Sequence, residues 1–198
     1  MNHLAHALLG GESPDLLLGS ILGDFVHGPV PEDLRMGVRV GIRLHRAIDV
    51  YTDTHAITQA ARAQFPAPYR RYAGIILDVW FDHLLARDFA RWSAVPLASY
   101  STQLIEILEA HAGELPTALA GYVRYMRRHG LPAAYAHKDA IAAALAGIGM
   151  RLSRANPLDS ALNAIAPLEA SLQRSFDEFF PELQEFAKIR LSQLLQVT

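Results

Sequence analysis

Residues 41–55 read GIRLHRAIDVYTDTH, and the pattern of this stretch indicates the helical structure of much of the chain. Its Ile, Leu, Val and Ala residues recur at the intervals that are typical of a helix packed against a core. The same stretch carries His45, Asp49 and Asp53, which follow one another at four-residue steps. Buried ionisable groups are costly unless they are paired, hydrogen-bonded or bound to a metal. We therefore predict a half-buried helix whose ionisable residues are buried for one shared reason.

The remainder of the chain shows the same helical character. Ser13, Pro14 and Asp15 form a typical helix start, with an N-cap residue, a proline in the first turn and an acidic residue after it. The sequence contains no Asn-Gly or Asp-Gly turn and no series of alternating strands. The patterns predict about eight or nine helices, the last two of which are separated at Pro181. We expect one compact all-α domain over residues 1–198.

Composition argues against several classes of protein. The 198 residues are 51% hydrophobic and 19% charged, which suits a sizeable core. The 18 Lys and Arg against 20 Asp and Glu give a net charge of −2, which argues against binding to nucleic acids or membrane surfaces. The lack of cysteine excludes disulfides, zinc–cysteine sites and thiol catalysis, and fits a reducing compartment. We expect no membrane span and no secretory signal, and hence a cytoplasmic protein.

Histidine and aspartate are concentrated in the N-terminal half. Six of the nine histidines lie within the first 83 residues, together with several aspartates that have apolar neighbours. In a helix, residues four positions apart project from nearly the same face. His45 and Asp49 are related in this way, and so are Asp78 and Asp82, so each pair can direct two ligands to one point. Imidazole and carboxylate groups without sulfur suit a divalent ion such as Mn²⁺, Fe²⁺ or Mg²⁺, held between facing helices.

Other interpretations of these residues stay open. The His45–Asp49 pair could be an ordinary helix-surface pair beside neighbouring arginines. A histidine close to the N-terminus, such as His6, could be a satisfied core residue. Asp78 is harder to explain in this way, because no basic residue lies three or four positions from it. His55 is expected only to cap or stabilise a turn.

Several stretches of the sequence resemble the acyl carrier protein phosphodiesterases, bacterial enzymes related in fold to the HD-domain phosphohydrolases. The resemblance rests on MNHLAH at the start, LLLGSILGDFVHG, GIRLHRAIDVYTDTH, RRYAGIILDVWFDHLLARDF and the late FDEFFPEL. These segments cover residues 1–92 and 176–183, so we expect a metal-site half at about 1–92 and a helical remainder at 93–198. Unlike ordinary HD proteins, the chain has no adjacent His-Asp dipeptide, the closest being the reversed Asp82-His83.

The resemblance implies an activity and a set of site residues. The family hydrolyses the phosphodiester that joins 4′-phosphopantetheine to holo-acyl carrier protein, leaving the apo form, with a divalent metal that is typically Mn²⁺. Carried over to this chain, the metal-site residues are His6, Asp24, His45, Asp78 and Asp82. For catalysis we expect a carboxylate, Asp49 or Asp53, to orient the water or accept its proton. His83 is expected to protonate the leaving oxygen, and Arg46 to hold a phosphate oxygen.

The substrate adds a further expectation, because acyl carrier proteins are small and strongly acidic. A basic patch should therefore steer the carrier to the enzyme, and the candidates are Arg70, Arg71, Arg124, Arg127 and Arg128. For the last two, an ordinary solvated helix end is an equally good interpretation. Two rival functions also remain at this point: an HD-like phosphohydrolase for a nucleotide or other small phosphodiester, and a non-catalytic helical protein.

Overall fold

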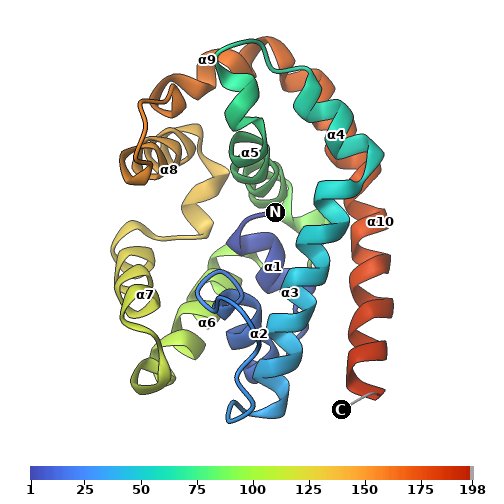
Figure 1. The fold of residues 1–198 in the computed structure, drawn as a ribbon, viewed down its shortest axis with the longest axis vertical. Coiled ribbons are helices and arrows are strands. Elements are labelled where there is room, and N and C mark those ends of the chain that lie inside the picture. The colour runs from blue at the N-terminus through green and yellow to red at the C-terminus, as the bar shows by residue number, and fades with distance from the viewer. Residues whose placement is uncertain (197–198) are drawn as a thin grey trace.

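The computed structural model describes residues 1–196, except for the side chain of Glu114. Over that part of the chain it contains α-helices and short 3₁₀ helices and no strand, so the predicted all-α class is confirmed (Figure 1). The α-helices are α1 (His3–Leu9), α2 (Pro14–Leu22), α3 (Met36–Thr54), α4 (Ala56–Ala63), α5 (Ala73–Arg87), α6 (Leu97–Ala110), α7 (Thr117–His129), α8 (Lys138–Arg151), α9 (Ala161–Ile165) and α10 (Glu169–Gln196). The 3₁₀ helices are Tyr69–Tyr72, Phe89–Arg91, Ala112–Glu114, Ala133–Ala136, Leu158–Ser160 and Ala166–Leu168.

The helix α1 lies in the middle of the molecule. In Figure 1, α3 and α10 run side by side along one edge, and α7 and α8 lie at the opposite edge. The helix α5 also packs against α1, and its residues Trp80 and Phe81 are completely buried in the core. The N-terminal residues therefore lie between the two edges of the molecule, where side chains from several helices can meet.

The predicted start of α2 is confirmed, and His55 has the capping role that the sequence suggested. Ser13 is the N-cap of α2, and Pro14 occupies the first turn. His55 separates α3 from α4, and its imidazole accepts a hydrogen bond from the backbone N–H of Ile57 at 3.3 Å. A side chain that satisfies one of the free N–H groups at a helix start is the usual N-cap arrangement. The sequence patterns did not separate α4 from α3, and this cap is what separates them.

The predicted break at Pro181 is wrong, because α10 continues through this residue. A proline inside a helix removes one backbone hydrogen bond and crowds the preceding turn. The apolar face of α10 is buried on both sides of the proline, with Phe180 before it and Leu183 after it. Burial of this continuous face stabilises the helix more than the proline disrupts it, as tertiary packing commonly does.

Close contact between α2 and α3 depends on two glycines. A Cβ atom on Gly19 would lie 2.2 Å from the carbonyl oxygen of Val38, and one on Gly41 would lie 2.4 Å from the carbonyl oxygen of Leu16. No side chain fits at either position, so the two backbones approach each other directly. This contact fixes the depth at which the middle of α3 enters the core.

No helix within residues 1–196 has both the length and the apolar character needed to cross a membrane.

Candidate metal centre

Three side chains from α1 and α3 form the candidate metal centre. His6, His45 and Asp49 each offer one ligand atom, and these atoms all lie within 4.8 Å of one another. The Nε2 atom of His6 is 3.0 Å from Oδ1 of Asp49, and the Nε2 atom of His45 is 3.1 Å from Oδ2 of the same carboxylate. This is the one such group among the residues that the structure describes.

The ring of His45 is held in place from three sides. Its Nδ1 atom lies 2.7 Å from the carbonyl oxygen of Ser20, to which it donates a hydrogen bond. The ring stacks on that of His6, with centroids 3.8 Å apart. A Cβ atom on Gly23 would lie 2.2 Å from the ring, so only glycine leaves room for it. The contact of Nδ1 with this carbonyl fixes the orientation of the ring, so that Nε2 faces the carboxylates of Asp24 and Asp49.

The charges in the centre favour a cation. Burial lowers the pKa of His45, but its contacts with Asp24 and Asp49 outweigh burial and raise it to about 9. Burial raises the pKa of Asp49, but the hydrogen bonds from the two histidines outweigh this and hold it well below its usual range. Burial lowers the pKa of His6 to about 4, against the opposing hydrogen bond to Asp49, so His6 is neutral at neutral pH. The carboxylates thus stabilise positive charge at the point where the ligand atoms meet.

These residues fit a divalent metal ion. Two imidazole nitrogens and one carboxylate, without sulfur, form a donor set that borderline and hard divalent ions accept. The hydrogen bond from His45 to the Ser20 carbonyl is the kind of outer contact that orients a metal-binding histidine. The side chain of Asp49 is 41% exposed, so the group opens to solvent on the carboxylate side. A centre of this kind can bind an ion and still admit a substrate.

Asp24 lies beside the centre, at its exposed edge. Its Oδ1 atom is 3.4 Å from Nε2 of His45, and its side chain is 46% exposed. On its other side, Oδ2 is 3.3 Å from Nδ1 of His3. Burial raises the pKa of Asp24, but His45 and His3 outweigh burial, so the pKa ends below the ordinary value. Asp24 is therefore an ionised carboxylate next to the three ligand atoms.

Asp78 and Asp82 lie around the start of α1, and the Met1 ammonium, which is 3.9 Å from Oδ1 of Asp49, lies between Asp78 and the centre. The carboxylate of Asp78 accepts a hydrogen bond from the Met1 ammonium at 3.1 Å. Asp82 is completely buried, and its two oxygens accept hydrogen bonds from the backbone N–H groups of Leu4 at 2.8 Å and Ala5 at 3.2 Å. Neither residue belongs to the group formed by His6, His45 and Asp49.

The other expected catalytic residues lie outside the group as well. His83 is buried, with Nδ1 2.8 Å from the carbonyl oxygen of Tyr135 and its ring 4.6 Å from that of Trp80. Asp53 is exposed and forms an ion pair with Arg62 at 2.6 Å. The four-residue step from Asp49 to Asp53 turns the side chain about 40° away from the centre, because four residues exceed one helical turn.

The expected arginines have varied surroundings. Arg46 donates a hydrogen bond to the carbonyl oxygen of Val26 at 2.7 Å. Arg70 donates to the carbonyl oxygens of Phe65 and Ala63, and Arg127 forms an ion pair with Glu109. The remaining three, which are exposed on the surface, are Arg71, Arg124 and Arg128.

His3 is the residue that sequence reasoning missed. Its ring contacts Asp24 on one side and packs against the tilted ring of Tyr122 on the other, with centroids 4.6 Å apart. The available signal was the three-residue spacing between His3 and His6, which places both rings on one side of a short helix. That spacing could not show that the segment just after α2, and α7, would supply the partners.

Comparisons with known proteins agree with the resemblance seen in the sequence. The family description "Acyl carrier protein phosphodiesterase" matches residues 1–183. A protein of that name from Serratia proteamaculans (strain 568) is 32% identical, covering 95% of this chain and 98% of the relative. Relatives of the same name from Yersinia pestis and Escherichia coli O45:K1 are 31% and 33% identical, covering 95% and 94% of this chain and 98% and 97% of the relatives. No solved structure matches the chain. The predicted membership is thus confirmed: the chain belongs to the acyl carrier protein phosphodiesterase family.

Proposed function

We propose that this protein hydrolyses the phosphodiester between 4′-phosphopantetheine and the serine of holo-acyl carrier protein, using a divalent ion, typically Mn²⁺, held by His6, His45 and Asp49. Family membership supports the reaction and the substrate. The observation that carries the metal centre is the meeting of three ligand atoms from α1 and α3 within 4.8 Å, beside the exposed carboxylate of Asp24.

The chain's own residues then have distinct tasks in the reaction. A bound divalent ion lowers the pKa of water and neutralises charge on the phosphate. Asp24 orients the attacking water and accepts its proton, since it is ionised and lies at the open edge of the centre. The water oxygen bonds to phosphorus, and the bond from phosphorus to the serine oxygen breaks. The serine oxygen then takes up the proton that Asp24 accepted from the water. Compared with the sequence-based expectation, Asp24 and Asp49 exchange roles.

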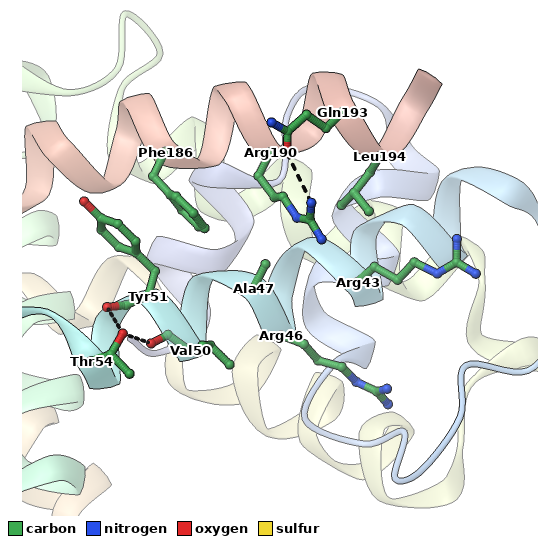
Figure 2. Close-up of a pocket in the computed structure, with 10 residues that line it drawn as sticks. All are labelled: Arg43, Arg46, Ala47, Val50, Tyr51, Thr54, Phe186, Arg190, Gln193 and Leu194. Atoms are coloured by element: carbon green, nitrogen blue, oxygen red, sulfur yellow. Dashed lines mark hydrogen bonds between the residues drawn. The ribbon is translucent and has the colours of Figure 1, made fainter. Parts of the chain in front are cut away.

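A groove between α3 and α10 suits the acidic carrier protein. It has a volume of 640 Å³, and Arg43, Arg46 and Arg190 contribute positive charge to its lining. Figure 2 shows the three arginines toward one end of the groove and apolar side chains toward the other, among them Phe186 and Val50, which is 64% exposed. None of the described residues that line this groove is acidic. The combination of apolar surface and arginine fits an amphipathic helix that carries acidic side chains.

Charge reversal at Arg43 and Arg190 should therefore weaken carrier binding. We expect the double variant Arg43→Glu/Arg190→Glu to raise KM for holo-carrier protein by about tenfold or more, with kcat nearly unchanged, because rim charges act on association. The wild-type KM should also rise with ionic strength, and that of the variant should not. Steady-state kinetics at two salt concentrations measure both effects. The comparison is Arg71→Glu/Arg128→Glu, which reverses two of the arginines that the sequence suggested for steering. Equal KM values for the two double variants would contradict this docking surface.

The test of the proposed function is loss of mass from the carrier protein. Protein purified without chelator, with Mn²⁺ added, should convert holo-carrier protein to the apo form, with release of 4′-phosphopantetheine seen by intact-mass spectrometry. Treatment with EDTA should stop the reaction and renewed Mn²⁺ should restore it. A panel of nucleotides and small phosphodiesters serves as the comparison. Conversion that is unaffected by EDTA would contradict the metal centre, and no conversion at all would contradict the substrate.

Metal binding should strengthen as the pH rises. The pKa of His45 is about 9 without metal, so at neutral pH an incoming ion must displace a proton from this ring. His6, with a pKa of about 4, has no proton to lose above pH 6. The affinity for Mn²⁺ should thus rise about tenfold per pH unit between pH 6.5 and 8.5 and level off near pH 9. Isothermal titration in two buffers of different ionisation enthalpy measures the affinity and the released proton. A dissociation constant independent of pH would contradict the assignment of His45.

A further inference from the structure

A cavity of 470 Å³ adjoins the candidate metal centre on the side of α7 and α8. Asn2 and His3 line its inner end, and His3 is the residue that contacts Asp24 at 3.3 Å. Asp24 in turn lies 3.4 Å from Nε2 of His45. Only the side chains of His3 and Asp24 therefore separate the cavity from His45, so a molecule whose phosphate occupies the metal centre has the cavity close at hand.

The cavity is built from one face of each neighbouring helix. On α7, Ala118, Tyr122 and Tyr125 follow one another at intervals of four and three residues. On α8, Ala144 and Gly147 lie three positions apart, and their small size leaves the space open. A Cβ atom on Gly147 would meet only the Arg151 guanidinium, at 4.0 Å, so the missing side chain is what creates part of the volume.

The lining combines apolar surface with a small number of polar groups. Phe25 and Ile148 contribute apolar surface, and the remaining lining includes tyrosines, Asn2 and Arg151. A volume of this size and a lining of this kind are typical of sites for small organic groups. A ligand that fills this cavity needs apolar surface together with a few groups that can form hydrogen bonds.

We propose that this cavity, between α7 and α8, binds the pantetheine arm of the substrate while its phosphate lies at the metal centre. The inference rests on the proposed function, because it is the phosphate of that substrate that places the arm. The arm consists of short aliphatic segments joined by amides and ends in a thiol, which matches the lining. The carrier protein then stays outside, on the serine side of the phosphate. Binding of the arm at a separate place explains selection of this phosphodiester over shorter ones.

The test fills the cavity without touching the metal centre. Gly147→Leu adds a side chain in the open space, and Gly121→Leu is the matched control, because a Cβ on that helical glycine also meets only an arginine, Arg124, at 3.9 Å. Gly121 does not line the cavity. Each Mn²⁺-loaded variant is assayed with holo-carrier protein and with methyl 4-nitrophenyl phosphate, a diester that has no arm. Inhibition by free 4′-phosphopantetheine and by inorganic phosphate is measured as well.

We expect Gly147→Leu to lower kcat/KM for holo-carrier protein by about tenfold or more, which is the usual effect of a misfit in a pocket. The inhibition constant of 4′-phosphopantetheine should rise by a similar factor, whereas that of inorganic phosphate and hydrolysis of the small diester should stay within about twofold. Gly121→Leu should match the wild type in every assay. If circular dichroism shows that Gly147→Leu is unfolded, Ala144→Leu fills the same cavity and decides the question.

The outcomes separate this inference from the function on which it rests. If the wild type converts holo-carrier protein and the folded cavity variant does so equally well, the cavity does not bind the arm. If both inhibitors lose affinity equally, the substitution acts on the phosphate site, which also overturns the inference. If the wild type does not convert holo-carrier protein at all, the proposed function is wrong and the assignment of the cavity is wrong with it.

Discussion

Replacement of Asp49 with alanine is expected to lower kcat/KM for holo-carrier protein by about 10³-fold, which corresponds to about 4 kcal/mol of lost transition-state stabilisation. The physical reason is that Asp49 is, among the residues that the structure describes, the one carboxylate in contact with both His6 and His45, at 3.0 and 3.1 Å. Without it, the centre loses the negative charge that an ion needs. Mn²⁺ content, measured by elemental analysis, should fall together with the activity.

The control for this prediction lies one helical turn away. Asp53 is on the same helix, exposed and paired with Arg62, so Asp53→Ala should keep the metal content and change kcat/KM by less than about twofold. Both variants should retain the wild-type helical signal in circular dichroism. If Asp49→Ala keeps both its metal and its activity, the centre lies elsewhere. Equal losses of metal and activity in the two variants would show that the effect comes from the overall charge of α3 and not from the position of Asp49.

Replacement of Asp82 with alanine is expected to destabilise the fold by about 3 kcal/mol or more. Asn2 is the N-cap of α1 but makes no capping hydrogen bond with its side chain, and Asp82 takes over that task from α5. It satisfies two free N–H groups in the first turn of α1, those of Leu4 and Ala5. Without the carboxylate, both groups are buried and unsatisfied. Denaturant titration of the metal-free protein measures the change in unfolding free energy.

A partly exposed aspartate provides the comparison. Asp88 pairs with Arg87 at the surface, so Asp88→Ala should cost less than about 1 kcal/mol. The variant Asp82→Asn keeps one acceptor oxygen and should lie between the wild type and Asp82→Ala. If folded Asp82→Ala is fully stable but binds no Mn²⁺, then Asp82 is a metal ligand, as the sequence suggested. A loss of stability with metal binding retained supports the capping role.

The sequence by itself determined the helical class and the family. The periodic apolar residues of the 41–55 stretch predict a helix because a helix places residues three and four positions apart on one face. The same rule correctly predicts that His45 and Asp49 point together, and the structure has them in contact at 3.1 Å. The cap at His55 was also predictable, because a cap depends on neighbours two residues away.

The tertiary structure alone decided which helices supply the partners. Asp78 and Asp82 have the same four-residue spacing as His45 and Asp49, yet they bind the Met1 ammonium and the first backbone N–H groups of α1, and neither belongs to the group of three ligand atoms. Local periodicity fixes which residues share a face of one helix, but not which helix that face meets. That choice depends on packing across the whole chain, such as the glycine contact between α2 and α3 that sets the depth of His45. An aspartate that caps a helix 78 residues away leaves no local signal in the sequence.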